Sequence, residues 1–303
     1  MSETFQSVAI IGLGLIGASI ARAVRAHLPE VRLRGFDLDP DVRARAGELE
    51  LVDDLAEGAA DAVAGAELVI LCVPVGAMAA AAEAIAPGLG PQALVSDVGS
   101  CKGFVASELR RVLPGARIVP AHPVAGTEKS GPDAGFAALF HGRWCILTPE
   151  EGADEADVAR LCAFWTALGA KVEVMDAWHH DTVLSVTSHL PHLIAFTIVH
   201  TASDIERVTE GEVIKYSAGG FRDFTRIAAS NPAMWRDIFL TNKDALLATL
   251  QRFNADLAAL EQAILADDGV ALFELFTRTA AIRRGIVEQG QDVGKPDFGR
   301  PSL

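Results

Sequence analysis

The chain has 303 residues, enough for two domains at roughly 150 residues each. Its 26 Lys and Arg residues against 40 Asp and Glu residues give a formal net charge of −14. This charge argues against non-specific nucleic-acid binding, which depends on a basic surface. The four cysteines are scattered and form no CxxC pair, as is typical of a reduced, cytoplasmic compartment.

Short apolar runs alternate with helical patterns through the first half of the chain. Most runs are continuous in Val, Ile and Leu, as expected for a parallel sheet covered on both faces. This alternation predicts a doubly wound α/β domain with a mainly parallel sheet over residues 1–177. The predicted strands are Val8–Ile11, Val31–Asp37, Glu67–Pro74, Ala93–Asp97, Arg117–Ala121, Trp144–Leu147 and Val172–Met175. The predicted helices include Ala18–His27, Gly76–Ala86 and Ala153–Leu168.

The first predicted strand leads directly into a glycine-rich loop with the sequence GLGLIG, which opens a helix. In such a loop the first glycine permits a tight turn, the second lets the backbone approach a pyrophosphate, and the third lets helix and strand pack closely. The helix N-terminus then offers N–H groups to the phosphates. The alternative is a tight turn without a ligand. The residues expected to bind the dinucleotide of this Rossmann-type domain are Gly12, Gly14, Leu15, Ile16 and Gly17.

Asp37 ends the second predicted strand, 20 residues after the last glycine of the loop. A carboxylate at this place can accept hydrogen bonds from ribose hydroxyls and would repel a 2′-phosphate, so it favours NAD over NADP. Arg34 and Arg43 lie nearby in the sequence and weaken that preference. A solvated aspartate is the alternative interpretation. Pro74, at the end of a later strand, is a further expected cofactor contact.

Two polar loops follow the ends of later strands, where ligands gather in open α/β sheets. They are residues 96–103, with the sequence SDVGSCKG, and residues 121–131, with the sequence AHPVAGTEKSG. His122 stands at a predicted strand end within the second loop. Because the pKa of an ordinary histidine is near neutrality, His122 is a candidate acid–base group, although a lone histidine is more often structural.

After about Trp178 the strand signals disappear and long apolar-periodic stretches follow, at 180–203, 204–217, 233–266 and 269–290. They predict an all-helical domain over residues 178–303. The stretch 182–203 contains no Asp, Glu, Lys or Arg, but its three histidines, proline and hydroxyl groups are too polar for a comfortable membrane span. We therefore expect a helix buried on nearly all sides in protein, and no membrane partner.

Basic side chains in the helical half are candidates for substrate binding. Arg222 and Arg226 follow a Gly-Gly pair, and a guanidinium binds a carboxylate in two-point geometry. The alternative for both is a solvated helix face. His189 and His192 form an HxxH pair, a weak metal signal that has no acidic or cysteine partner at suitable spacing. We expect no metal, and core histidines are the other interpretation of this pair.

Taken together, these motifs resemble the prephenate/arogenate dehydrogenases of tyrosine biosynthesis over essentially the full length of the chain. HPVAGTEKSG and GGFRDFTRIA do most to separate this family from other dehydrogenases with the same glycine loop. The resemblance implies a cofactor domain joined to a helical domain that forms a homodimer. The matching segments are GLGLIG (12–17), SDVGSCKG (96–103), HPVAGTEKSG (122–131), SHLPH (188–192), GGFRDFTRIA (219–228) and NPAMWRDI (231–238).

The resemblance also implies a reaction: NAD-dependent oxidation of a small dianionic cyclohexadienol, with loss of its ring carboxylate. His122 matches the catalytic histidine that bonds the ring hydroxyl, Ser100 matches its orienting partner, and Arg226 matches the main carboxylate anchor. Competition by tyrosine at the active site stays open. Further matched positions that line or gate the substrate pocket are Arg222, His192, Trp235 and Glu128.

The side chain of the substrate is left open by the sequence. Prephenate carries a keto group and arogenate an ammonium group, and the basic Arg222 favours prephenate, with arogenate or dual use as the alternative. Two other functions stay as remote alternatives. One is a dehydrogenase for a hydroxyacid or an imine, and the other is a dinucleotide-sensing protein that has lost the chemistry.

Overall fold

The structure is a computed structural model that describes residues 5–127, 129–206 and 218–288. Internal contacts divide the chain into residues 1–247 and 248–303. Helix α12 (Lys243–Leu265) begins in the first part and continues into the second.

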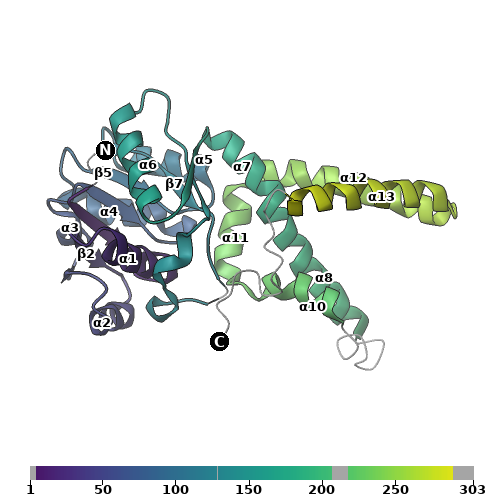
Figure 1. The fold of residues 1–303 in the computed structure, drawn as a ribbon, viewed down its shortest axis with the longest axis horizontal. Coiled ribbons are helices and arrows are strands. Elements are labelled where there is room, and N and C mark those ends of the chain that lie inside the picture. The colour runs from purple at the N-terminus through teal and green to yellow at the C-terminus, as the bar shows by residue number, and fades with distance from the viewer. Residues whose placement is uncertain (1–4, 128, 207–217, 289–303) are drawn as a thin grey trace. The chain divides into compact units, whose positions relative to one another are not determined.

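A six-stranded, fully parallel sheet forms the centre of the first part (Figure 1). The strand order is β3-β2-β1-β4-β5-β6: from β1 the first strands are added on one side of the sheet, and from β4 onward they are added on the other side. This is the Rossmann order, and it confirms the predicted α/β class. The strands are β1 (Ser7–Ile11), β2 (Arg32–Phe36), β3 (Asp54–Leu55), β4 (Leu68–Leu71), β5 (Leu94–Asp97) and β6 (Arg117–Ile118).

A second sheet of three short strands follows: β7 (Ala121–Pro123), β8 (Trp144–Leu147) and β9 (Lys171–Val174). Strand β7 runs antiparallel to β8, and β8 runs parallel to β9. The predicted strand 117–121 is therefore two strands in two sheets. The ladder with β5 ends after Val119, whose N–H donates to the Val95 carbonyl oxygen, because the next N–H on that side, from Ala121, donates to the side chain of Asp97 instead of to the backbone. Strand β3 was not predicted, since two residues carry no periodic signal.

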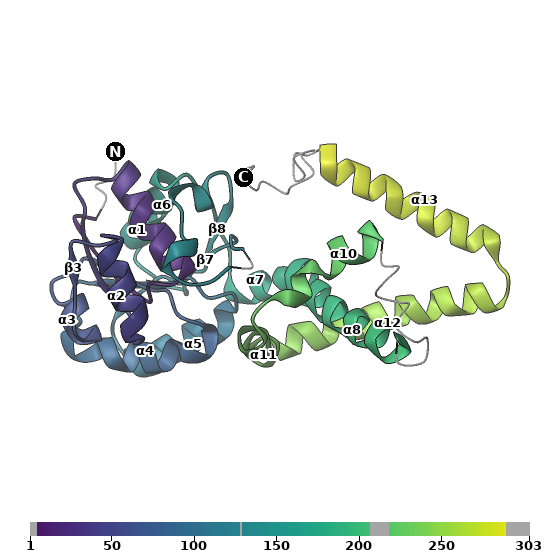
Figure 2. The ribbon, with the colours of Figure 1, turned by 90° about the horizontal axis from the view of Figure 1, so that it is seen from below.

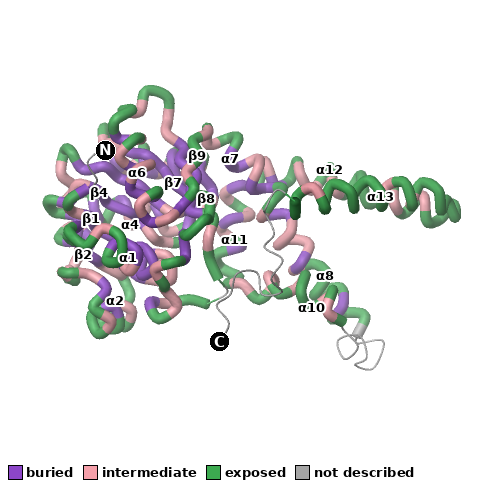
Figure 3. Tube along the Cα trace, viewed as in Figure 1, coloured by how far each residue is buried: buried purple, intermediate pink, exposed green. Residues whose placement is uncertain are grey.

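Helices cover both faces of the large sheet (Figure 2). The strand residues alternate between two cores: Val8 and Ile10 face one core, and Ala9 and Ile11 face the other. In Figure 3 these strands form the buried interior of the first part. The first core contains residues of α1 (Leu15–His27), α2 (Pro40–Glu48) and α6 (Glu155–Ala167). The second contains residues of α3 (Ala59–Val63), α4 (Met78–Ile85) and α5 (Lys102–Val112).

Beyond β9, all the regular elements that the structure describes are helical, as predicted. The predicted helix 233–266 is two helices that meet at Asn242, and the predicted stretch 204–217 falls largely on residues 207–217, outside the described residues. The domain limits 1–177 and 178–303 stay a prediction. The helices are α7 (Ala177–Leu184), α8 (Leu190–Glu206), α10 (Gly219–Thr225), α11 (Pro232–Thr241), α12 and α13 (Gly269–Ile286).

Helices α7 and α8 are joined by one π-helical turn, Ser185–His189. Pro191 lies two residues after this turn and has no N–H group, so the regular hydrogen-bond pattern cannot pass through it. By length and composition alone, the stretch Ala177–Ile205 could cross a membrane, but the same test is passed by core helices of soluble proteins. Within its own chain 28% of the apolar window is buried, so the helix is less enclosed than expected.

The second part, over its described residues 248–288, consists of the rest of α12 together with α13. None of these residues is buried within the chain. Large apolar side chains are exposed along both helices, and an apolar surface of this kind indicates contact with another protein surface. They include Leu257, Ile264, Leu265, Val270, Phe273, Phe276 and Ile282.

Candidate active site

The glycine-rich loop connects β1 to α1 at the point where the sheet order reverses. Gly12 has a φ of +98°, and a Cβ atom there would lie 2.4 Å from the carbonyl oxygen of Cys72. A Cβ on Gly17 would lie 1.9 Å from the carbonyl oxygen of Gly12. Both positions therefore require glycine for backbone reasons. A Cβ on Gly14 would meet no protein atom within 4 Å, so this glycine serves no packing need of the chain.

The start of α1 fits the phosphates of a dinucleotide. Its N-cap, Gly14, supplies no capping side chain, and the first turn, which holds Leu15 and Ile16, contains no acidic residue. The N–H groups of a first helical turn have no partner within the helix and attract an anion. The space beside Gly14, where a Cβ atom would meet no protein atom, lies at this helix N-terminus. These residues therefore fit a bound dinucleotide.

Asp37 follows β2, and its carboxylate accepts hydrogen bonds from the backbone of the glycine-rich loop and of the segment after β2. Its Oδ2 accepts the Leu13 N–H at 2.7 Å, and its Oδ1 accepts the Asp39 N–H at 3.0 Å. Each carboxylate oxygen can accept a further hydrogen bond, so these contacts leave capacity for ribose hydroxyls. The Arg43 guanidinium donates to the backbone oxygen of Asp37 at 2.5 Å, whereas Arg34 donates to the Ala64 carbonyl oxygen at 2.8 Å. Arg43 is therefore the cation beside Asp37.

His122 lies on β7 and is buried, with 8% of its surface exposed. Its Nδ1 is 2.8 Å from Nε2 of His180, and Nδ1 of His180 is 2.8 Å from Oδ1 of Asp181. Burial lowers the pKa of His122 well below its usual value, and the nearby His180 and Lys102 add to this effect. Burial also lowers the pKa of His180, although Asp181 acts in the opposite direction. His122 is therefore neutral at physiological pH.

A buried ion pair fixes the backbone around His122. The Lys102 ammonium and the Asp97 carboxylate are both fully buried and form a short contact. The ammonium also donates to the carbonyl oxygen of Ala121 at 2.6 Å, and the Ala121 N–H donates to Asp97 Oδ1 at 3.2 Å. The end of β5, the start of α5 and the start of β7 are thereby held together next to the histidine.

A stacked histidine–tryptophan pair lies on the helices that follow. His192 stacks on Trp235, with ring centroids 3.6 Å apart, and donates from Nδ1 to the Ser188 carbonyl oxygen at 2.8 Å. The pKa of His192 is lowered by burial and by the charge of Arg226, which indicates that Arg226 lies close to it. His192 of α8 is thus brought onto Trp235 of α11, and the charge of Arg226, in the turn after α10, acts on His192.

His189 occupies the core next to this pair. Its Nδ1 accepts a hydrogen bond from the Asn242 side-chain amide at 3.0 Å, and the same amide donates to the Asp181 carbonyl oxygen at 2.9 Å. Burial lowers the pKa of His189 to about 4. The neutral ring therefore carries its proton on Nε2, which has no partner among the described residues.

Four predicted site residues have no described hydrogen bond to His122 or His192. Ser100 is half-buried just before α5, and the described contacts include no hydrogen bond from Ser100 to His122. Arg222 is exposed on α10, and Pro74 is exposed after β4. Glu128 lies outside the described residues. The roles of all these residues stay predictions.

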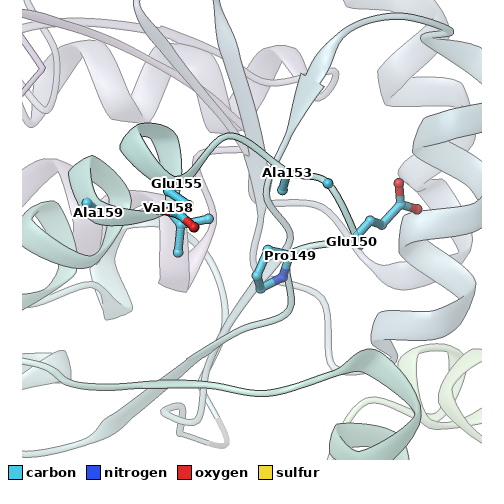
Figure 4. Close-up of a pocket in the computed structure, with 7 residues that line it drawn as sticks. Pro149, Glu150, Ala153, Glu155, Val158 and Ala159 are labelled. Carbon is cyan, nitrogen blue, oxygen red and sulfur yellow. The ribbon is translucent and has the colours of Figure 1, made fainter.

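Two further observations bear on ligands. Among the described residues, no three or more His, Cys, Asp and Glu side chains gather as a metal site would require. A surface hollow of about 340 Å³ lies between residues Pro149 and Ala159, at the start of α6 (Figure 4). None of the predicted site residues lines it.

Sequence reasoning missed His180, Asp181, Asn242 and the Lys102–Asp97 pair. Lys102 and Asp97 stand inside the quoted SDVGSCKG motif, so their presence was visible but their burial was not. His180 and Asp181 lie at the start of the helical half, where neither periodicity nor a motif marks them. Only the folded chain brings them to β7.

The Rossmann sheet, the glycine turn and the buried histidine beside it define a dinucleotide-dependent oxidoreductase. The family model "Prephenate dehydrogenase, nucleotide-binding domain" matches residues 20–174, and "Prephenate dehydrogenase, dimerization domain" matches residues 176–278. The chain belongs to the prephenate dehydrogenase family, which confirms the resemblance seen in the motifs.

Two curated proteins and one solved structure illustrate this similarity. A cyclohexadienyl dehydrogenase of Zymomonas mobilis is 46% identical over 92% of this chain and 95% of its own length. A prephenate dehydrogenase of Bacillus subtilis is 35% identical over 94% of this chain and 77% of its own length. A crystal structure of prephenate dehydrogenase from Aquifex aeolicus, in complex with hydroxyphenyl propionate and NAD+, matches with a TM-score of 0.88 and 35% identity, covering 94% of this chain and 100% of that one.

Proposed function

We propose that this chain catalyses the NAD-dependent oxidative decarboxylation of prephenate to 4-hydroxyphenylpyruvate. The observation that carries the proposal is the neutral, buried His122 on the short strand β7, in a member of the prephenate dehydrogenase family. Oxidation of a hydroxyl group needs a base that can accept the hydroxyl proton, and a neutral imidazole is such a base.

The proposed reaction balances with the residues present. Bound NAD would accept the hydride from C4 of the ring. His122 accepts the proton of the C4 hydroxyl group as the carbonyl forms. The bond from C1 to its carboxylate then breaks, CO2 leaves, and the electron pair makes the ring aromatic. The oxygen at C4 becomes a phenolate, and His122 returns the proton to it.

The substrate carries two carboxylates, and we propose that Arg226 binds one of them. The charge of Arg226 acts on His192, a half-buried ring that stacks on the buried Trp235. A local basic group explains how a chain with a net charge of −14 can bind a dianion. Ser100, Arg222 and Glu128 are proposed further contacts, with Ser100 orienting His122.

We propose that Gly12, Gly14, Leu15, Ile16 and Gly17 bind the pyrophosphate, with Pro74 lining the cofactor site. Asp37 is the proposed ribose ligand. We further propose a homodimer in the cytoplasm, since the match to the family's dimerization domain covers residues 176–278 and the exposed apolar side chains of α12 and α13 need a partner surface. Tyrosine, which like the substrate has a six-membered ring with a para oxygen and a side-chain carboxylate, is a proposed competitor at this site.

A second candidate is an enzyme that also accepts arogenate, because the relative with 46% identity is named a cyclohexadienyl dehydrogenase. The test is NADH formation at 340 nm with the purified protein, comparing prephenate with arogenate under NAD and under NADP. Turnover of prephenate with NAD is expected. Turnover of arogenate alone would support the oxidative decarboxylation and refute prephenate as the substrate. Turnover of neither, with NAD still bound, would refute the proposed function.

A further inference from the structure

The hydrogen bonds around His122 specify which of its ring nitrogens carries the proton. A neutral histidine has one N–H donor and one acceptor nitrogen, and the partner of one nitrogen fixes the role of the other. In water the Nε2–H form is the more populated. Asp181 sets the direction of these hydrogen bonds, because a carboxylate can only accept.

Asp181 is held as an acceptor by the N-terminus of α5. Its Oδ1 accepts the Lys102 N–H at 2.8 Å, and its Oδ2 accepts the Gly103 N–H at 2.9 Å. Its own carbonyl oxygen is fixed by the Asn242 amide at 2.9 Å. The carboxylate therefore cannot turn away, and the His180 nitrogen facing it at 2.8 Å has to be the N–H donor.

The proton on His180 in turn determines the proton position on His122. With its proton on Nδ1, neutral His180 presents Nε2 as an acceptor, and this Nε2 lies 2.8 Å from Nδ1 of His122. A hydrogen bond between the two rings requires the proton to sit on Nδ1 of His122. The remaining nitrogen of His122, Nε2, is left with its lone pair available.

We infer that His180 and Asp181 are positioning residues that fix His122 as its Nδ1–H tautomer, so that Nε2 is the atom that accepts the substrate proton. Once Nε2 has taken that proton, His122 is a cation, and His180 with the Asp181 carboxylate stabilises it through the same two hydrogen bonds. The catalytic consequence rests on the proposed function, whereas the tautomer itself does not.

The tautomer can be measured directly, without turnover. The imidazole 15N shifts of protein labelled with 15N-histidine, recorded with NAD bound, distinguish a protonated ring nitrogen from an unprotonated one. The chain has eight histidines, and spectra of His122→Asn and His180→Asn identify the two rings. We expect His122 with a protonated Nδ1 and an unprotonated Nε2. A protonated Nε2 in the wild-type protein would overturn the inference.

Asp181→Asn tests the source of the tautomer. Both oxygens of Asp181 accept backbone N–H groups, so an amide keeps only one of these two hydrogen bonds. With its oxygen on the Gly103 N–H, its NH2 group donates to His180 and places the His122 proton on Nε2, and the nitrogen shifts of His122 exchange. With its oxygen on the Lys102 N–H, the shifts stay and only the stabilising charge of the carboxylate is lost. We expect kcat to fall by roughly 10²–10⁴, the scale set by a comparable carboxylate-to-amide change beside a catalytic histidine, while the KM for prephenate changes little. Unchanged shifts with an unchanged kcat would refute the assignment.

Matched controls separate positioning from loss of folding. His179→Gln changes an exposed histidine next to His180, and Asp176→Asn changes the N-cap of the same helix. Both should keep the wild-type shifts and kcat. If Asp181→Asn does not fold, His180→Phe removes the acceptor for His122, and a mixture of the two His122 tautomers is then expected. A protein with the Nδ1–H tautomer but no activity on prephenate would refute the proposed function and leave the tautomer assignment standing.

Discussion

At the scale of single residues, the proposed chemistry depends most on His122. His122→Asn removes the proton acceptor while keeping a polar side chain of similar size. We expect kcat to fall by roughly 10²–10⁴, the usual range for loss of a general base, with NAD affinity retained. Steady-state assays and NAD titration measure the two effects. A kcat near that of the wild type would show that the proton leaves by another route.

Arg226 and Arg222 lie close in sequence, but Arg226 is the one whose charge reaches His192. Arg226→Ala should raise the KM for prephenate by roughly 10–100-fold, as expected for one lost charge-assisted hydrogen bond. NAD affinity should not change. Arg236→Ala, which removes an exposed arginine of α11, is the control. Equal damage to prephenate and NAD binding would point to a structural role for Arg226.

The preference for NAD is assigned to Asp37. Asp37→Ser removes the negative charge and leaves Arg43 available for a 2′-phosphate. The ratio of kcat/KM for NADP to that for NAD should rise by roughly tenfold or more, the scale of one relieved charge repulsion. Asp37→Asn, which keeps an acceptor for the Leu13 N–H, controls for damage to the loop. The same cofactor ratio in both variants and in the wild type would refute the assignment.

Among the helices, α11 carries a site residue, so the stability of this helix should affect substrate binding. Asn231 caps this helix by accepting the N–H groups of Ala233 and Met234 at 2.9 and 3.1 Å, and the helix carries Trp235. Asn231→Ala should lower the free energy of unfolding by about 1 kcal/mol and raise the KM for prephenate. Asp154→Ala, at the cap of α6, should lower stability without changing KM. If both variants raised the KM, the change in KM would follow from lower global stability and not from the position of α11.

The strands and helices also differ in how well the sequence predicts them. Strands β1, β4, β5 and β8 follow short apolar runs, and the glycine loop is specified by local backbone needs, so both were predicted. The break at Asn242 was not, because the apolar pattern continues across it and only the side-chain contacts of Asn242 with Asp181 and His189 explain it. The motifs identified His122, but its link to His180 joins residues 58 positions apart and no periodic pattern encodes it.

At the scale of the whole molecule, the cluster of buried histidines makes stability depend on pH. Burial lowers the folded-state pKa of His122, His180, His189 and His192, whereas in the unfolded chain each is near 6.5. Between these values the unfolded state binds more protons, so stability rises with pH and falls as the pH drops below about 6.5.

For His189, with a folded pKa of about 4, this linkage amounts to about 3 kcal/mol lost as the pH falls from 7 to 4. Urea unfolding at a series of pH values should show the decline. His189→Gln should make the decline shallower, and His179→Gln, which changes an exposed side chain, should not. Stability that stays flat from pH 7 to pH 4 would contradict the buried, neutral state of these rings.

The proposed homodimer is the last property of the whole molecule that can be tested. Residues 248–288 have no buried side chain within the chain, although α13 exposes Phe273 and Phe276, so the isolated chain leaves a large apolar surface in water. Phe276→Glu places a charge on that surface and should convert the dimer into a monomer at micromolar concentration. Light scattering after gel filtration measures the mass directly.

Arg278→Glu is the matched control for this change. It lies two residues after Phe276, about 200° around the helix, and also adds negative charge to α13. We expect it to remain dimeric. Because the apolar surface of one chain has no other cover among the described residues, the monomeric Phe276→Glu protein should also unfold at a lower temperature, with a Tm that no longer rises with protein concentration. A wild-type protein that is monomeric at all concentrations would refute the homodimer, and a dimeric Phe276→Glu protein would place its interface elsewhere.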